Sequence, residues 1–152
     1  MKLKIIFITF FISFNYAHTQ AHKNLRKIDS IKKHIKIIKL DDSISIADEH
    51  YKIGELYRKS LLSDSAYHYF QKAEKVFKNN DKKYEIAITL YGIAVCQTYD
   101  KDYTGSESAT INAIEILKPL KKYKELYSCY NNLAVVSNNL SEYNRAIEYH
   151  QI

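Results

Sequence analysis

The sequence predicts an all-α fold: an α-solenoid of helix–turn–helix repeats that follows an N-terminal signal peptide. Three observations lead to this prediction. Gly and Pro are scarce, with three and one among 152 residues, which favours long helices over many tight turns. Residue types recur at a spacing of forty positions along the chain. Within each copy, apolar residues follow the three-to-four-residue spacing of a helix face.

The first residues have the pattern of a secretory signal peptide. The basic stretch MKLK is followed by the apolar run IIFITFFISF, and Ala17 and Ala21 then offer small residues for cleavage. The run is shorter than the ~18 apolar residues that indicate a membrane span, and no Cys directly follows it to carry a lipid. We therefore predict a signal peptide over residues 1–21 and an exported protein, periplasmic or on the outer face of the cytoplasmic membrane. An uncleaved signal anchor is the alternative.

The formal net charge of +6 is unevenly distributed. Residues 22–40 hold seven basic side chains and one acidic one, whereas residues 41–152 hold fourteen basic and sixteen acidic ones, a net charge of −2. Nucleic-acid binding requires a basic surface on the folded body of a protein. The main body is therefore not predicted to bind nucleic acid.

Residues 22–43 match no position of the repeat and carry an apolar stripe at helical spacing. Lysines surround the members of the stripe, which are Ile28, Ile31, Ile35 and Ile38. Such a stripe is typical of a helix that packs on a protein core, so we expect a basic capping helix on the first repeat. A basic amphipathic helix also suits a membrane surface, and a membrane contact through residues 22–40 is the alternative.

Three copies of a forty-residue unit align without a gap between residues 44 and 152. Large apolar residues coincide at two positions of the unit, and small residues coincide at two more. The large positions are Ile46, Ile86 and Leu126, and Ile53, Ile93 and Leu133. The small positions are Gly54, Ala94 and Ala134, and Ala66, Ser106 and Ala146. We divide this part of the chain into units 47–86, 87–126 and 127–152, the last of which is incomplete.

Each unit is predicted to contain two helices joined by a polar turn. In the first unit, one face of the first helix carries Ile53 and Gly54, and the inward face of the second carries Phe70 between two alanines. Two helices approach closely only where small side chains lie at the crossing and large ones fill the flanking gaps. Longer polar joints, residues 78–83 and 118–124, are expected to lead into the next unit.

These units resemble tetratricopeptide repeats. That family has a large and then a small residue in the middle of helix A, an aromatic residue at the turn, and small residues spaced along helix B. The corresponding residues here are IGELY with Ala66, Phe70 and Ala73; IAVCQ with Tyr103, Ser106 and Ala113; and LAVVS with Tyr143 and Ala146. The period departs from the ~34 residues of the family. We expect the six extra residues at the far ends of the helices and in the joint to the next unit.

No pattern in the sequence indicates catalysis. The six His are scattered along the chain, and metal-binding Cys–His spacings, phosphate-binding Gly-rich loops and nucleophile elbows are missing. We predict that the protein is not an enzyme and has no catalytic residue, metal site or cofactor. Cys96 and Cys129 fall at different heights of neighbouring helices, so we expect small buried thiols rather than a disulfide.

The resemblance also implies which residues line a concave groove. In the family, one side of every helix A faces this groove and contacts extended or helical peptides. The matching positions here are Tyr51, Glu55 and Arg58; Tyr91, Val95 and Thr98; and Asn131, Val135 and Asn138. Asn can hydrogen-bond to a peptide backbone, and Tyr adds rigid apolar area with a polar tip. The alternative is that these are ordinary solvated helix positions.

The third unit stops at its twenty-sixth position, Ile152. Because terminal repeats need a cap or a polar outer face, we expect a piece of a longer protein whose C-terminal edge self-associates in isolation. A signal peptide followed by tetratricopeptide repeats resembles the exported sensory region of bacterial membrane regulators. This resemblance implies a non-catalytic scaffold that binds a protein or peptide of unknown identity. The alternative is a membrane-surface or assembly component that residues 22–40 hold to lipid, with the repeats as a spacer.

Overall fold

The computed structural model describes residues 2–38 and 42–151, with side chains from residue 19 onward. Within these residues the chain forms seven helices and no strand, which confirms the predicted all-α fold. The helices are α1 (Lys2–Ile35), α2 (Ser43–Lys59), α3 (Ser63–Asn79), α4 (Lys83–Tyr99), α5 (Tyr103–Leu117), α6 (Tyr123–Asn139) and α7 (Tyr143–His150). Met1 of the predicted signal peptide, residues 39–41 of the predicted capping segment and Ile152 of the third unit lie outside the described residues.

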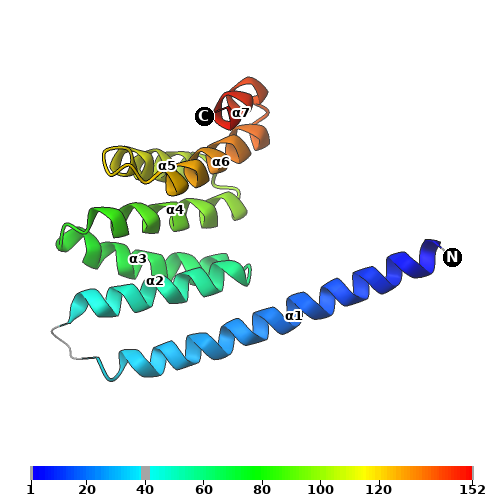
Figure 1. The fold of residues 1–152 in the computed structure, drawn as a ribbon, viewed down its shortest axis with the longest axis horizontal. Helices are drawn as coiled ribbons and strands as arrows, with labels where there is room; N and C mark the ends of the chain where they lie inside the picture. Colours follow the sequence, from blue (N-terminus) through cyan, green and yellow to red (C-terminus); the bar gives the residue numbers. More distant parts are fainter. Residues whose placement is uncertain (1, 39–41, 152) are drawn as a thin grey trace.

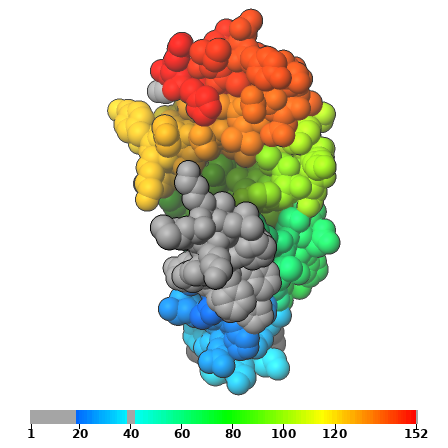
Figure 2. All heavy atoms as spheres, turned by 90° about the vertical axis from the view of Figure 1, so that its right-hand side faces the viewer, coloured from blue at the N-terminus to red at the C-terminus, as the bar shows by residue number. Residues whose placement is uncertain are grey.

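Helices α2 to α7 form three antiparallel pairs that are stacked in chain order (Figure 1). Figure 2 shows the same order from the side, from α1 at the bottom to α7 at the top. Each helix contacts the next one along the chain, and α4 also contacts both α2 and α6. The arrangement is consistent with the expected α-solenoid. The pairs begin at Ser43, Lys83 and Tyr123, four residues before the expected starts of the units.

The stack is tighter on the side of α2, α4 and α6. The backbones of these three helices approach one another in sequence, whereas among the described residues no Cα atom of α5 comes within 8 Å of one in α3 or α7. Helices α5 and α7 are joined by a side-chain ion pair between Glu107 and Arg145. Because the first helices of the pairs lie closer together than the second ones, we infer that the stack curves with α2, α4 and α6 on its inner side. This is the side on which the predicted groove residues were placed.

The helices begin every twenty residues, because all five turns between α2 and α7 share one geometry. At each turn one residue other than Gly lies in the left-handed region, and the N–H of the next residue donates to the carbonyl five positions back. The left-handed residues are Leu61, Asp81, Lys101, Lys121 and Ser141. The hydrogen bond satisfies a carbonyl that the helix end would otherwise leave without a partner.

The extra residues of the forty-residue period lie mainly in the helices. Residues 60–62 join α2 to α3, and residues 80–82 join α3 to α4, so the expectation of a longer joint over residues 78–83 is wrong. Its outer residues belong to the solvated ends of two 17-residue helices, and solvated helix ends are as polar as a loop. Pro119 follows the end of α5, where it cannot donate the next helical hydrogen bond, and five residues, 118–122, lead to α6.

A phenylalanine of α3 joins the first two pairs. The Phe70 ring is fully buried and lies against Gly54 of α2 and Gly92 of α4, where an added Cβ would come within 2.7 Å of the ring at either position. Both helices can approach the ring only because these residues have no side chain. Gly54, Ala94 and Ala134 are all buried, as the alignment of small residues predicts. Gly92 was not among the predicted crossing residues.

Helix α1 packs antiparallel on α2 through its C-terminal half. Ile28 is buried, Asn24 Nδ2 donates to Ser60 Oγ at 3.1 Å, and Lys32 Nζ donates to the Tyr57 hydroxyl at 3.3 Å. The helix is continuous from Lys2 to Ile35 and its N-terminal half extends beyond the stack (Figure 1). Its backbone therefore marks no boundary at residue 21, and the signal peptide stays a prediction. Among the described residues, no helix has both the length and the apolar character that crossing a bilayer requires.

The third pair is less covered than the first two. Ala47 of α2 and Ala87 of α4 are fully buried, whereas Tyr127 at the equivalent position of α6 is 73% exposed. Helix α7 has eight residues, of which Ala146 is buried. The self-association expected at this edge stays a prediction.

Candidate functional site

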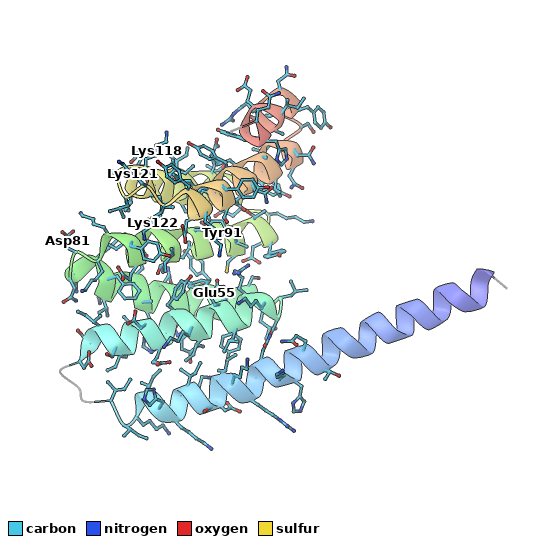
Figure 3. The ribbon with its side chains drawn as sticks, in the orientation of Figure 1. Glu55, Asp81, Tyr91, Lys118, Lys121 and Lys122 are labelled. Atoms are coloured by element: carbon cyan, nitrogen blue, oxygen red, sulfur yellow. The ribbon has the colours of Figure 1, made fainter. Side chains whose placement is uncertain are left out.

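The nine predicted groove residues lie on α2, α4 and α6, and we call them together the A face. Because they recur at equivalent positions of helices that contact one another in sequence, we infer that they form three rows across the stack. The rows are Tyr51, Tyr91 and Asn131; Glu55, Val95 and Val135; and Arg58, Thr98 and Asn138. Figure 3 shows members of two rows, Glu55 on α2 and Tyr91 on the neighbouring α4.

The two tyrosines of the first row form part of the packed interior. Tyr51 and Tyr91 are half-buried and pack against the main apolar core, and the Tyr51 ring lies 5.7 Å from the Phe70 ring, measured between centroids. Burial is the main cause that raises the pKa of both hydroxyls above its ordinary value. Asn131, at the same position of α6, is exposed. Asn131 is therefore more accessible to a ligand than the two tyrosines are.

A paired carboxylate and guanidinium occupy the first unit of the A face. Arg58 Nε donates to Glu55 Oε1 at 2.8 Å, and Arg58 Nη2 donates to Glu55 Oε2 at 2.9 Å. The hydrogen bond to Glu55 is the main cause that raises the pKa of the Arg58 guanidinium. Each side chain is only 21% exposed. The two opposite charges meet in fork geometry, and Lys59 Nζ lies 3.8 Å from Glu55 Oε2 as a second cation. The carboxylate of this part of the face is therefore fully compensated.

Thr98 belongs to a polar network inside the stack. Its Oγ1 lies 2.7 Å from Ser106 Oγ and 3.2 Å from Asn132 Oδ1. Asn132 Nδ2 in turn donates to Ser106 Oγ at 3.0 Å and to Thr110 Oγ1 at 2.9 Å. The network links α4, α5 and α6. Thr98 is half-buried, so we infer that it orients this junction more than it contacts a ligand.

The accessible part of the A face is mainly apolar and amide in character. Asn131 and Asn138 are exposed, Val135 is 41% exposed, and Val95 is half-buried. Sequence reasoning missed Tyr99, an exposed residue at the end of α4 whose hydroxyl is coupled electrostatically to Arg58. Successive residues of a helix do not share a face, so the stripe that ends at Thr98 gave no signal for Tyr99.

The thiols lie in the interior, away from solvent. Cys96 and Cys129 are free and fully buried, which confirms the expectation of unpaired core thiols. Burial raises the pKa of both thiols to about 12. Among the described residues, no group of three or more His, Cys, Asp or Glu side chains could hold a metal ion.

We expect both thiols of the folded protein to resist iodoacetamide at about pH 8 and to react once the chain is unfolded, because only the thiolate attacks. Mass spectrometry of samples with and without denaturant measures the alkylation, and the unfolded sample is the control. The raised pKa also implies that the unfolded chain loses these protons first. The contribution of the thiols to stability is therefore present below pH ~8.5 and is lost as the pH rises towards the folded pKa. Rapid alkylation of the folded chain would contradict the burial of the thiols.

Compared with models of known protein families and with curated protein sequences, the chain shows no match. A role for the A face is therefore argued from the arrangement of its residues and not from a related protein.

Proposed function

We propose that the chain is a non-catalytic scaffold of tetratricopeptide-like repeats that holds an extended peptide on the A face. The resemblance of the repeated residues supports the family assignment, together with helix pairs that recur every forty residues. The curvature inferred for the stack supports the choice of face, because it puts α2, α4 and α6 on the inner side. Solenoids commonly use such concave surfaces for binding.

The observation that carries the proposal is the continuity of the A face across the three pairs. Exposed amides on α6 can bond to a peptide backbone, and Val95 and Val135 offer apolar contacts next to them. The Glu55–Arg58 pair is already satisfied within the chain. The face therefore suits a ligand that presents its backbone and small apolar side chains rather than a strongly charged one.

Matched charge substitutions test this proposal. Val135 of α6 is 41% exposed and Ile111 of α5 is 40% exposed, so a glutamate at either position disturbs the fold to a similar extent. We expect Val135→Glu to weaken the binding of peptides selected from a random twelve-residue display library by at least about tenfold, because a peptide would bury the unpaired charge. Ile111→Glu should leave the affinity unchanged. Equal losses in the two variants, measured by fluorescence anisotropy, would contradict the choice of face.

Tyr91 is a less suitable position for testing peptide binding than the sequence suggests. Because Tyr91 packs on the core, replacing it would lower stability together with binding. Asn131 and Asn138 are cleaner positions for the same test, since both are exposed.

We further propose that the scaffold works outside the cytoplasmic membrane, as the sensory or interaction region of a bacterial regulator. The support is the basic–apolar–small pattern of the N-terminus combined with the repeats. Export predicts that the native product lacks its first 17 to 21 residues, because the peptidase cuts after Ala17 or Ala21. Mass spectrometry of the native protein measures this, and a cytoplasmic product that retains Met1 would refute it.

A further inference from the structure

Four exposed lysines lie at the junction of α5 and α6, three in the turn and one, Lys124, in the first turn of α6. We call residues 118–124 the lysine turn; its lysines are Lys118, Lys121, Lys122 and Lys124, all of them exposed. Figure 3 shows Lys118, Lys121 and Lys122 together at one end of the stack, the end that also carries Asp81. Four like charges on seven residues repel one another unless an anion lies between them.

No carboxylate of the described residues forms an ion pair with these lysines. Lys122 Nζ instead lies 4.8 Å from the centroid of the Tyr84 ring, and Tyr84 donates to Glu125 at 3.1 Å. The neighbouring turn differs, because Lys78 is paired with Glu74 and Lys83 with Asp81. The lysine turn is thus a concentration of uncompensated positive charge.

Lys118 is the C-cap of α5, where a cation suits the helix dipole, but helix stability does not account for Lys121 and Lys122. Lys122 is the N-cap of α6 and, like Lys82 of α4, makes no side-chain cap hydrogen bond, whereas Asp102 of α5 accepts from the N–H of Gly105. A cation at a helix N-terminus also opposes the helix dipole. Lys121 occupies a left-handed position, with φ of 54°, where Gly would be free of strain. Both positions would favour other residues if stability alone determined them.

Apolar side chains are exposed among the lysines. Leu120 is 39% exposed and Tyr123 is 72% exposed. Tyr127 is one helical turn beyond Tyr123 and is also exposed. A surface that combines lysines with Leu and Tyr suits the interface of a lipid bilayer, where ammonium groups meet phosphates and amphipathic rings lie at headgroup level.

The basic helix α1 is less suited to this role. Its apolar stripe turns towards α2, where Ile28 is buried and Ile31 and Ile35 are half-buried. Lys23 and Lys27, among other lysines, are exposed on the outer face of the helix, away from the apolar stripe. Leu25 and Ile37 stay exposed on this segment, but the stripe that an interfacial helix needs is turned inward. This weakens the membrane alternative based on residues 22–40.

We propose that the lysine turn docks the protein on an anionic phospholipid bilayer. The four ammonium groups contact headgroup phosphates, and Leu120 and Tyr123 enter the interfacial layer. Pro119 restricts the backbone of the turn and so lowers the entropy lost on docking. This surface is separate from the A face, so the proposal stands or falls independently of peptide binding.

Vesicle flotation of the full chain tests the proposal. Binding to phosphatidylcholine vesicles measures the contribution of the apolar N-terminal run. Vesicles that also contain phosphatidylglycerol measure the additional binding that is due to anionic lipid, which we call the excess. We expect Lys118→Gln/Lys121→Gln/Lys124→Gln to lower the excess about a hundredfold, at roughly fivefold for each lysine. The matched control, Lys23→Gln/Arg26→Gln/Lys27→Gln, removes the same charge from α1 and should have little effect. Leu120→Ser/Tyr123→Ser should also lower the excess on anionic vesicles, because the interfacial contacts of both side chains are lost.

Three outcomes would overturn the proposal. Equal losses in the two triple variants would mean that binding follows net charge alone. An unchanged excess in the turn variant would place the contact elsewhere. Turn-dependent binding of poly-glutamate, without an excess on anionic vesicles, would assign the lysine turn to an acidic protein partner. Circular dichroism of each variant checks that weaker binding to anionic vesicles is not caused by unfolding.

Discussion

Phe70→Ala is expected to lower the free energy of unfolding by about 3–5 kcal/mol, the cost of removing a large buried aromatic side chain. Phe70 is fully buried and fills the space between Gly54 of α2 and Gly92 of α4. Its removal leaves a cavity that glycines cannot fill. Domains of this size have about 5–15 kcal/mol in total, so the substitution should remove a large share of the stability. Urea unfolding followed by far-UV circular dichroism measures the difference.

A double-mutant cycle tests whether the ring and the glycine are coupled as described. Gly92→Ala alone should cost about 1–3 kcal/mol through overpacking, because the new Cβ would lie 2.7 Å from the Phe70 ring. In the presence of Phe70→Leu, the same substitution should cost much less. Additivity of the two changes to within about 0.5 kcal/mol would show that the ring does not occupy this space.

Asn132→Ala is expected to cost about 1–3 kcal/mol, because it leaves buried hydroxyls of the polar network without a partner. Asn132 Nδ2 donates to Ser106 and Thr110, and its Oδ1 lies within hydrogen-bond distance of Thr98. The adjacent Asn131 is exposed and provides the control, since Asn131→Ala should change stability by less than about 0.5 kcal/mol. Equal effects of the two substitutions on the urea midpoint would contradict the network.

A second variant separates the network from simple packing. Ser106→Ala/Thr110→Val/Asn132→Leu removes these donors and acceptors together. Thr98, the remaining member of the network, is only half-buried and keeps its hydrogen bond to the carbonyl of Ala94. We expect this triple variant to be more stable than Asn132→Ala alone, since replacing both partners by apolar groups is nearly neutral. A further loss in the triple variant would mean that the hydrogen bonds themselves stabilise the junction of α4, α5 and α6.

The architecture was predictable because packing constrains residue size at the helix crossings. Gly54, Ala94 and Ala134 must be small for paired helices to touch, and this requirement is visible in the sequence. The twenty-residue spacing of the turns was not predictable in the same way. Its left-handed positions are occupied by Leu, Asp, Lys and Ser, and a backbone hydrogen bond that needs no particular side chain leaves no signature in the residue types.

The candidate site was predictable only in part, because helical periodicity describes one helix at a time. It indicates an open stripe for Tyr51 and Tyr91, but both side chains pack against the apolar core and are half-buried. Asn132 was missed for a related reason. An amide in a helix is typical of a solvated face, and only the approach of Ser106 and Thr110 from α5 makes it an interior donor.

The central claim is that a ligand peptide lies against α2, α4 and α6. Photo-cross-linking measures this most directly, with benzoylphenylalanine placed either at Val135 on the A face or at Ile111 on α5, two sites of nearly equal exposure. A peptide selected from the display library is bound to each labelled protein, irradiated and identified by mass spectrometry. The account predicts a cross-link from position 135 and none from position 111. A cross-link from position 111 without one from position 135 would contradict it.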